Sequence, residues 1–264
     1  MEFETMYASL PTRLRAVACC ILLAVGVNQA ALADTAIETE TAQIGQKGEW
    51  NFSQAYEYES AKDGTGQGTL TQFEYGITDR SELLIEPFFY VKVSPDGEKS
   101  VSGMGDLEIT PSYMIIKEHG WVPATLLALK FKVPTGSTNV DSSGKWDYYP
   151  YVILGQHYAG WTFNANAGEN FAGNEHGGGF TSNFVWDIEA EREVLPNLTW
   201  FVEAFSSEDG VPTGSTSMEY QFTEHFNAFV VYSYTSEHSN IGRIGFNIGF
   251  GGPPPPTMAP TAPR

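Results

Sequence analysis

The sequence predicts an all-β protein: a transmembrane antiparallel up-and-down β-barrel of about 12 strands, formed by residues 48–250. Three observations predict this fold. Apolar and polar residues alternate along short segments, as they do when lipid covers one face of a strand and water the other. The connections between these segments are alternately short and long. Aromatic residues make up 14% of the chain, which suits the aromatic girdles of outer-membrane barrels.

The first five predicted strands show the alternation most clearly. Their apolar faces are Trp50, Phe52, Tyr56 and Tyr58 in residues 49–58; Thr71, Phe73, Tyr75 and Ile77 in 71–77; Leu83, Ile85, Phe89, Val91 and Val93 in 82–93; Leu107, Ile109, Pro111, Tyr113 and Ile115 in 106–115; and Leu127, Leu129, Phe131 and Val133 in 127–133.

The sixth strand, residues 146–158, is aromatic on both faces, so the sequence leaves its phase open. The pattern then resumes. The remaining apolar faces are Trp161, Phe163, Ala165 and Ala167 in 161–170; Phe184, Trp186, Ile188 and Ala190 in 183–191; Leu198, Trp200, Val202 and Ala204 in 198–204; Met218, Tyr220 and Phe222 in 217–222; Phe226, Ala228, Val230, Tyr232 and Tyr234 in 226–234; and Ile244, Phe246, Ile248 and Phe250 in 243–250.

Prolines interrupt several of these segments. Pro87, Pro111, Pro123 and Pro150 have no backbone N–H to give to a ladder, so each predicts a strand end, a bulge or a locally open pair.

The connections sort by length. Short links follow every second strand, around residues 78–80, 118–120, 159–160, 195–197 and 223–225, and longer polar loops follow the others, at 60–67, 94–104, 135–145, 173–179 and 206–214. Bacterial outer-membrane barrels have short periplasmic turns and long external loops. A soluble β-sandwich has no physical reason to sort its loops in this way, so the connections favour a barrel with both termini in the periplasm.

The first 33 residues have the pattern of a signal peptide. Arg13 and Arg15 precede an apolar run, and the run ends at a small-residue cleavage site, Ala31-Leu32-Ala33. Both cysteines of the chain, Cys19 and Cys20, lie in this run, so the mature protein is expected to have no disulfide.

Two polar segments flank the predicted barrel. Residues 34–47 are expected either to plug the lumen or to lie free. Phe250 is the terminal aromatic residue that the barrel-insertion machinery is expected to read. Residues 251–264 follow it and include Pro253–Pro256, which favour an extended coil without sheet bonds. This tail is expected to be a periplasmic spacer, a tether to the cell wall or a dispensable end.

The composition limits the classes of binding partner that the protein can have. A net charge of −18 excludes nucleic acid as a partner class. The five histidines are scattered and none has metal-ligand spacing, so no metal and no other cofactor is expected. The expected partners are outer-membrane lipid, the insertion machinery and a small-molecule solute.

The inward faces are rich in charge. The candidate lumen-lining residues are Glu74, Glu86, Asp106, Glu108, Lys130, Lys132, Glu189, Glu203 and Arg243. A turn centred on His119 places Glu108 opposite Lys130 and Asp106 opposite Lys132, and a similar turn after residue 77 brings Glu74 near Glu86. Two interpretations stay open: the lysines attract an anionic group in a selective passage, or the charges pair with one another and fill a narrow barrel.

One motif suggests an enzymatic function. Some outer-membrane barrels hydrolyse lipids with a His and a Ser one residue apart on a strand, and His238-Ser239-Asn240 is similar to that His-x-Ser-Asn signature. Here His238 and Ser239 are adjacent, so in a regular strand they point to opposite faces. No catalytic residue is therefore expected, and a lipid esterase is only a minor alternative.

Several short motifs resemble the outer-membrane family named after the meta-pathway of phenol degradation. They are Gly105-Asp106-Leu107-Glu108, residues 130–136 (KFKVPTG), Tyr149-Pro150, Glu203 with the loop 206–214, and residues 243–250 (RIGFNIGF). The resemblance spans most of residues 49–250. It implies a barrel connected with the catabolism of aromatic compounds and a role in passing hydrophobic or aromatic molecules across the outer membrane, and it supplies no catalytic residues.

The sequence thus predicts a passive channel in the outer membrane of a Gram-negative cell for small, hydrophobic or aromatic molecules. The alternative is a structural or adhesive barrel, closed by its own side chains, that acts through its external loops.

Overall fold

The computed structural model describes residues 39–140, 142–174, 177–207 and 210–252. The predicted signal peptide and the Pro-rich stretch that begins at residue 253 lie outside the described residues.

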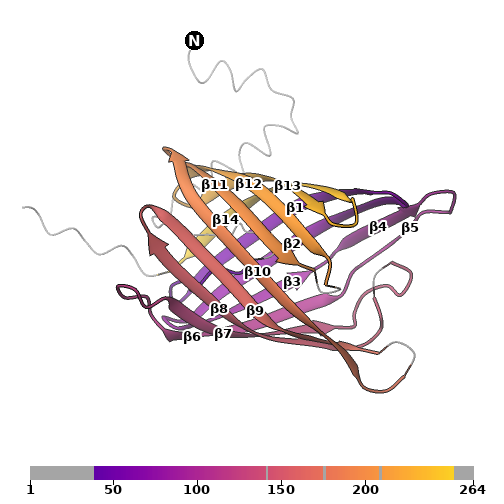
Figure 1. Ribbon diagram of the computed structural model, residues 1–264, viewed down its shortest axis with the longest axis horizontal. Helices are drawn as coiled ribbons and strands as arrows, with labels where there is room; N and C mark the ends of the chain where they lie inside the picture. The colour runs from indigo at the N-terminus through magenta and orange to yellow at the C-terminus, as the bar shows by residue number, and fades with distance from the viewer. Residues whose placement is uncertain (1–38, 141, 175–176, 208–209, 253–264) are drawn as a thin grey trace, which may run out of the picture.

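The strands form one antiparallel sheet that closes on itself (Figure 1). Closure is made by β1 (Glu49–Ala61), which pairs with β2 (Gly64–Thr78) on one side and with β14 (Asn240–Gly251) on the other. The segments between them are β3 (Ser81–Pro87), β4 (Tyr90–Pro95), β5 (Val101–Gly103), β6 (Leu107–Ile116), β7 (Ala124–Val133), β8 (Asp147–Tyr158), β9 (Trp161–Gly173), β10 (Phe180–Leu195), β11 (Leu198–Ser206), β12 (Pro212–Thr223) and β13 (Phe226–Thr235).

These fourteen segments make twelve barrel strands, as the sequence predicted, because two strands are each broken once. β3 and β4 both pair with β2, with a shift of one residue at Phe88-Phe89. β5 and β6 continue each other in one register against β4 and β3. The two breaks lie side by side, and the Gly105 N–H donates to the Phe88 carbonyl across them at 2.9 Å.

Three prolines lie at interruptions of the ladder. Pro87 ends β3 at the first break. Pro111 lies inside β6, which pairs with β3 at this position, whereas the pairing with β7 is interrupted between Ile109 and Ser112. Pro150 likewise pairs with β7, and the pairing of β8 with β9 is interrupted there. A residue without an N–H leaves one side of the ladder open.

The lengths of the connections follow the predicted asymmetry with two exceptions. The connection between β6 and β7, predicted to be short, spans residues 117–123 and is longer than the β4–β5, β9–β10 and β11–β12 loops. The predicted long loop at residues 60–67 is wrong: β1 and β2 extend to a tight turn at Lys62-Asp63. Glycine and threonine at positions 64–69 are typical of a loop, since glycine is depleted in strands. Here Gly66 and Gly68 are nevertheless paired on both sides, with β1 and with β4.

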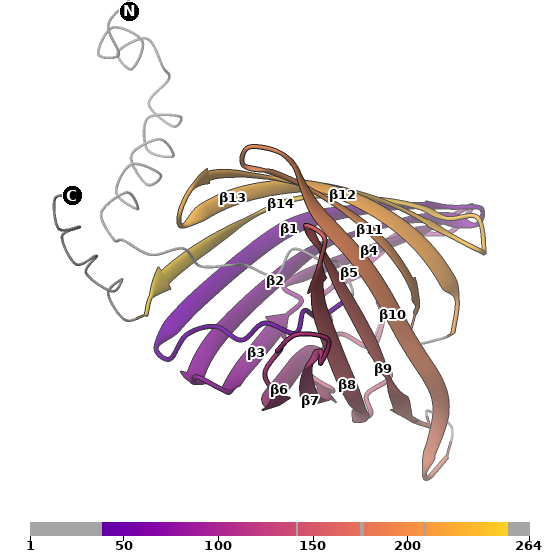
Figure 2. The same ribbon diagram turned by 60° about the vertical axis from the view of Figure 1, so that its left-hand side comes forward.

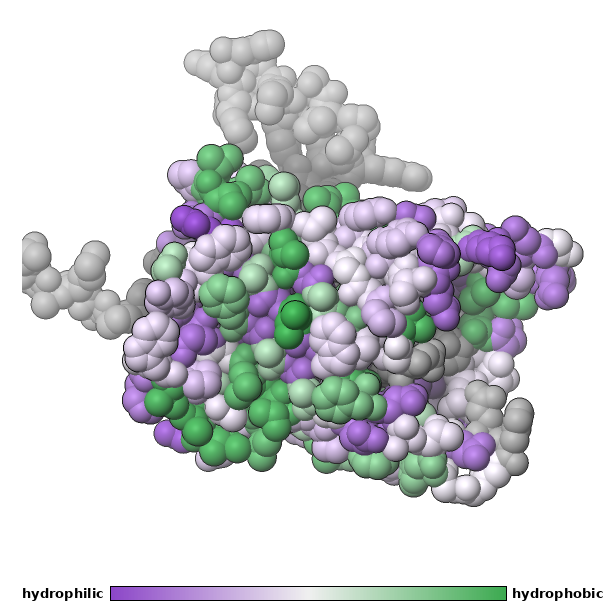
Figure 3. Space-filling view, in the orientation of Figure 1, coloured by the Kyte–Doolittle hydropathy of each residue, from purple (hydrophilic) through white to green (hydrophobic). Residues whose placement is uncertain are grey.

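The outer face of the wall is apolar. Large apolar and aromatic side chains that are more than a third exposed stand on it, among them Tyr113, Ile115, Leu127, Val152, Leu154, Phe163, Phe184, Ile188, Val202, Met218, Val230, Tyr232 and Ile244. Figure 3 shows hydrophobic (green) residues over the barrel wall on the face in view, whereas the projecting end formed by β4 and β5 is mostly purple. An exposed apolar belt around a closed sheet is what a lipid bilayer requires.

Among the described residues, no helix has the length and apolar character needed to cross a membrane.

The lipid-facing position of Val230 gives a stability test. Val230 is 52% exposed, and its cross-strand neighbours are Met218 and Ile244. We expect Val230→Arg to destabilise the folded barrel by about 2–4 kcal/mol, the cost of a basic side chain near the bilayer midplane. Urea titration of folding into lipid vesicles measures it. Ser236→Arg, in the turn after β13, is the control and is expected to leave stability unchanged; equal stability of both variants would contradict the assignment of the outer face.

Candidate functional site

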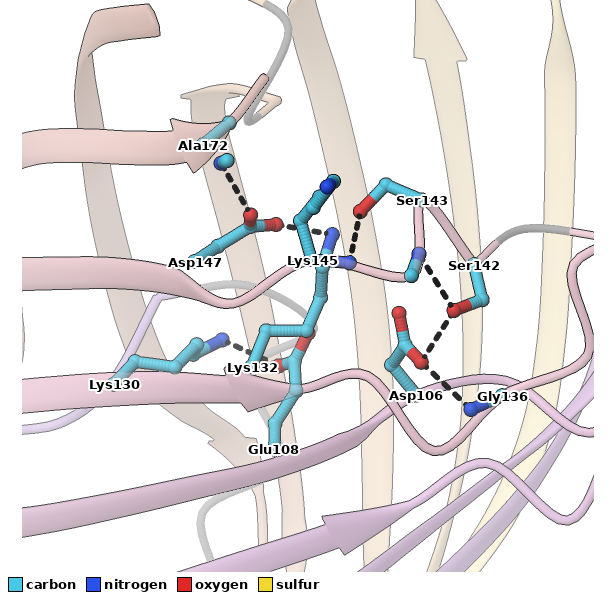
Figure 4. A network of polar contacts seen from close by, with 12 residues as sticks. Asp106, Glu108, Lys130, Lys132, Gly136, Ser142, Ser143, Lys145, Asp147 and Ala172 are labelled. Carbon is cyan, nitrogen blue, oxygen red and sulfur yellow. Dashed lines mark hydrogen bonds and ion pairs between the residues drawn. The ribbon is translucent and has the colours of Figure 1, made fainter. Parts of the chain in front are cut away.

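The barrel interior holds a network of two lysines and three carboxylates, shown in part in Figure 4. The Lys130 Nζ lies 3.1 Å from the Glu108 Oε2 and 3.9 Å from the Glu86 Oε2. The Lys132 Nζ lies 2.7 Å from the Asp147 Oδ2 on β8. These side chains are only 8–22% exposed. Each lysine therefore has an acidic counter-charge within the lumen, which favours the mutually paired interpretation over two lysines that attract an anion.

The predicted register in this region is wrong by two residues. Glu108 stands opposite Lys132 rather than Lys130, and its ion pair with Lys130 is a diagonal one. The cause lies in the turn, which is centred between Gly120 and Trp121, because His119 pairs with Val122. This turn offsets the register by three residues from a turn centred on His119, and the ladder shift between Met114 and Ile116 takes one of them back.

Asp106 faces the loop after β7 rather than Lys132. Its Oδ1 accepts hydrogen bonds from the Gly136 N–H at 2.7 Å and from the Ser142 hydroxyl at 2.8 Å (Figure 4). Asp106 is 5% exposed. It therefore fastens this loop, residues 134–146, against the break between β5 and β6.

Glu74 also has a neighbour other than the predicted one. Its carboxyl group is in hydrogen-bonding contact with Glu82 and Asn51. Glu86 stands opposite Gln72 and accepts a hydrogen bond from its side-chain amide at 2.9 Å. The turn between β2 and β3 is centred between Asp79 and Arg80, which offsets the predicted pairing by one residue, and the ladder shift between Gly76 and Thr78 adds one more, so Glu74 stands opposite Leu84.

Arg243 faces the lumen from β14. It forms an ion pair with Glu57, its direct cross-strand partner on β1. The pair lies across the seam where the first and last strands close the barrel, so it stabilises the closure.

A row of polar residues crosses four neighbouring strands at one level. Glu203 on β11 stands opposite Glu189 on β10, Glu189 opposite Asn164 on β9, and Asn164 opposite Gly155 on β8. The Asn164 side-chain amide donates to the Glu189 Oε1 at 3.0 Å. The three polar side chains are 3–5% exposed.

The stretch before β1, residues 39–48, runs inside the ring of strands and follows this row (Figure 2). The N–H and hydroxyl of Thr39 donate to the Glu203 Oε1 at 2.7 and 2.6 Å. The Ala42 N–H donates to the Asn164 Oδ1 at 3.3 Å, and the Gly45 N–H donates to the Glu82 Oε2 at 3.1 Å. Of the two arrangements expected for residues 34–47, the described part thus occupies the lumen.

An apolar patch on the inner wall faces this segment. Met114, Leu126, Tyr149, Tyr151, Ile153 and Val185 form one buried cluster with Ala42, and Ile44 packs against it. The rings of Tyr149 and Tyr151 stack with their centroids 4.5 Å apart. The strand whose phase the sequence left open thus points two tyrosines into the barrel.

A cavity of about 490 Å³ lies beside the segment at the end with the short turns. Thr41 and Gln43 line one side of it, and residues of β8–β12, among them Glu191 and Phe201, line the rest. At its rim His157 donates to Glu118 from its backbone N–H at 2.9 Å. Hydrogen bonds from His157 lower the pKa of the Glu118 carboxyl group.

The residues considered for lipid hydrolysis lie in the turn between β13 and β14. His238 has a φ of 70° and its Nδ1 is 2.7 Å from the Tyr234 hydroxyl. The Ser239 N–H donates to the Thr235 hydroxyl. The described residues include no group of three or more His, Cys, Asp or Glu side chains that is arranged to hold a metal ion.

Sequence reasoning missed the uncharged and apolar members of the interior. Asn164, Asn166 and Asn170 alternate with the predicted apolar face of residues 161–170, and this spacing is the signal that points to a polar ladder in the lumen. Thr39 and Ala42 left no comparable signal, because a single irregular segment has no periodicity.

The loop held by Asp106 gives a second test. We expect Asp106→Ala to free residues 134–146, because it removes both hydrogen bonds to the Asp106 Oδ1, and trypsin then cleaves at Lys145 several-fold faster. Timed proteolysis of the folded protein, with fragments identified by mass, measures this. Asp96→Ala, in the exposed β4–β5 turn, is the matched control, and equal cleavage in both variants would refute the role of Asp106.

Comparisons with known proteins agree with this architecture. A family model described as "Putative MetA-pathway of phenol degradation" matches residues 33–252. No curated protein matches the chain in sequence.

Three solved structures are similar in fold. An outer membrane channel from Pseudomonas putida F1 is 13% identical, and the match covers 81% of this chain and 100% of that one with a TM-score of 0.63. The NanC porin is 13% identical, with 75% and 98% covered and a TM-score of 0.54. The KdgM porin, solved in complex with disordered oligogalacturonate, is 14% identical, with 75% and 99% covered and a TM-score of 0.53. At these identities the likeness shows the fold. With its closed apolar-belted wall and the family match over most of its length, the chain belongs to the phenol-degradation MetA-pathway family and is an outer-membrane β-barrel.

Proposed function

We propose that this barrel is a passive outer-membrane channel for small hydrophobic or aromatic molecules. The proposal extends the channel and porin architecture of the similar structures to a particular class of solute.

The observation that carries the proposal is the apolar patch on the inner wall. The interior of a water-filled porin is polar, whereas here Met114, Leu126, Ile153 and Val185 and the stacked Tyr149–Tyr151 pair point inward. An aromatic or aliphatic solute gains free energy by contact with such a surface, at about 25 cal/mol for each Å² that leaves water. The family description, which refers to phenol degradation, supports the same class of solute.

The charged network frames this patch. Lys130 and Tyr149 are direct cross-strand partners on β7 and β8. A solute at the patch therefore passes close to a paired ammonium group, which orients a polar substituent without binding it tightly. Side chains that are already paired with one another give a polar lining with little net affinity.

Uptake into liposomes tests the proposal. We expect vesicles with the refolded barrel to take up phenol faster than empty vesicles do, and faster than they take up glucose or glycine. Heat-modifiable migration on a gel establishes that the protein is folded. A folded barrel that passes none of these solutes would overturn the proposal and favour the alternative, a closed barrel that acts through its external loops.

The two lysines give a sharper test of the lining. We expect the double variant Lys130→Ala/Lys132→Ala to lower the ratio of benzoate to phenol uptake by about three- to tenfold. The physical reason is that Glu86, Glu108 and Asp147 lose their counter-charges and repel an anion by about 1 kcal/mol. Uptake of both solutes is compared side by side, with Lys99→Ala in the exposed β4–β5 turn as control. An unchanged ratio in a folded double variant would remove these lysines from the lining.

A further inference from the structure

We propose that residues 39–46, which we name the inner segment, occupy the barrel's solute-binding site as an internal substitute for the solute. The natural ligand is then a small molecule with an apolar body and a hydrogen-bond donor head, a hydroxyl or an ammonium group. This inference rests on the proposed function, since it names the class of solute and the site at which it binds.

The polarity of the contacts is the first argument. Three side chains of the wall, Glu203, Asn164 and Glu82, receive hydrogen bonds from the inner segment through their oxygen atoms. The segment supplies the donors, which are the N–H groups of Thr39, Ala42 and Gly45 and the hydroxyl of Thr39. A wall that offers acceptors at these positions binds a ligand that carries donors.

The apolar contacts are the second argument. Ala42 is 4% exposed and packs with Ile44 on the cluster that contains Leu126 and Ile153. Asn164, which binds the Ala42 N–H, stands next to this cluster. One short stretch thus satisfies an acceptor and covers apolar wall at the same place, as an amphipathic solute of similar size would.

The wall is shaped for an occupant at this place. A Cβ on Gly155 would lie 2.5 Å from the Ala42 Cβ, and a Cβ on Gly76 would lie 2.1 Å from the Gln46 carbonyl oxygen. Neither glycine needs a left-handed backbone, so close approach explains both.

The inner segment leaves part of the site unused. The Glu189 Oε2 and both side-chain polar atoms of Asn166 have no hydrogen-bond partner among the described residues, although these residues are 4% and 2% exposed. Glu189 stands directly opposite Glu203 in the ladder. Buried polar groups are rarely left without a hydrogen bond. The unused groups of Glu189 and Asn166 therefore indicate that the site can accommodate a better hydrogen-bond donor than Thr39.

The segment also has space to move into. The 490 Å³ cavity lies against Thr41 and Gln43, on the side of the segment that faces the short turns. A solute that enters from the loop end can therefore displace the segment towards the periplasm without opening the barrel wall.

A cross-link between the segment and the wall tests the placement. In Ala42→Cys/Gly155→Cys the two Cβ positions are about 2.5 Å apart, and a shift of the segment of about 1 Å reaches disulfide geometry. We expect the folded barrel to cross-link fully on oxidation with diamide. Uptake of 2-phenylethylamine should then fall at least tenfold and return on reduction, while the single variants Ala42→Cys and Gly155→Cys stay insensitive to reductant. Failure to cross-link, or uptake that the cross-link does not change, would overturn the proposal.

The ligand class is tested on the rate of cross-linking, which needs no transport. Three probes share one apolar body: 2-phenylethylamine, 2-phenylethanol and phenylacetate. We expect the amine to slow cross-linking most, the alcohol less, and phenylacetate not at all. In a barrel that also carries Glu203→Gln the advantage of the amine over the alcohol should fall about tenfold, whereas Glu59→Gln, the same change elsewhere on the inner wall, should leave it within twofold.

The two assays separate the two claims. Equal protection by phenylacetate, or no protection by any probe, would refute the ligand class. A barrel that shows the expected protection but no uptake of any solute would refute the proposed channel function and leave the binding site standing.

Discussion

In a lipid bilayer the backbone N–H and C=O groups of an exposed strand edge have no water to bond with, so a spanning sheet must close. This constraint governs the whole protein. β1 satisfies it by pairing with β2 and with β14 along its full length, twelve residues on each side. Closure fixes which face of every strand meets lipid, because side chains alternate strictly across the sheet. Closure also encloses the side chains at the inward-facing positions.

The enclosed charges show the consequence. Lys130, Lys132 and Arg243 are each paired with carboxylates of neighbouring strands, whereas Glu189 and Glu203, two carboxyl groups, stand opposite each other. Pairing of opposite charges across neighbouring strands stabilises the barrel wall. Two facing carboxyl groups, by contrast, are held by donors: the Asn164 amide for one and Thr39 for the other. The inner wall therefore carries two kinds of polar cluster, the ion pairs of the basic side chains and the row that contains Glu189 and Glu203.

The inner segment contacts the second of these clusters. The N–H groups of Thr39, Ala42 and Gly45 and the Thr39 hydroxyl donate to side-chain oxygens of the wall, and Ala42 and Ile44 pack on the apolar patch of the inner wall. A barrel of twelve strands is wider than one that its own side chains can fill. The segment supplies the missing volume, and a solute of similar chemistry competes for the same surface. The inner segment thus connects the width of the barrel, the filling of its lumen and the class of solute that can bind there.

The sequence by itself determined the strand count and the faces. Strict alternation in segments such as 106–115 and 127–133 allows only one assignment of the lipid and lumen sides. A shift of one residue would turn every apolar side chain of the strand away from lipid and into the lumen. The inward positions of Asp106, Glu108, Lys130 and Lys132 followed from this. Alternation carries no information on register, which depends on bulges such as the one between Met114 and Ile116.

Three further features were decided only by the tertiary structure. The partners of Glu74 and Glu108 depend on the residues at which the turns are centred and on the ladder shifts beside them. The phase of β8 depends on its neighbours, because a strand that is aromatic on both faces fits either way by pattern alone. The place of Thr39 and Ala42 depends on contacts with Glu203 and Asn164, which lie more than a hundred residues away in sequence. Local patterns fix local geometry, whereas contacts between distant residues arise only when the barrel closes around them.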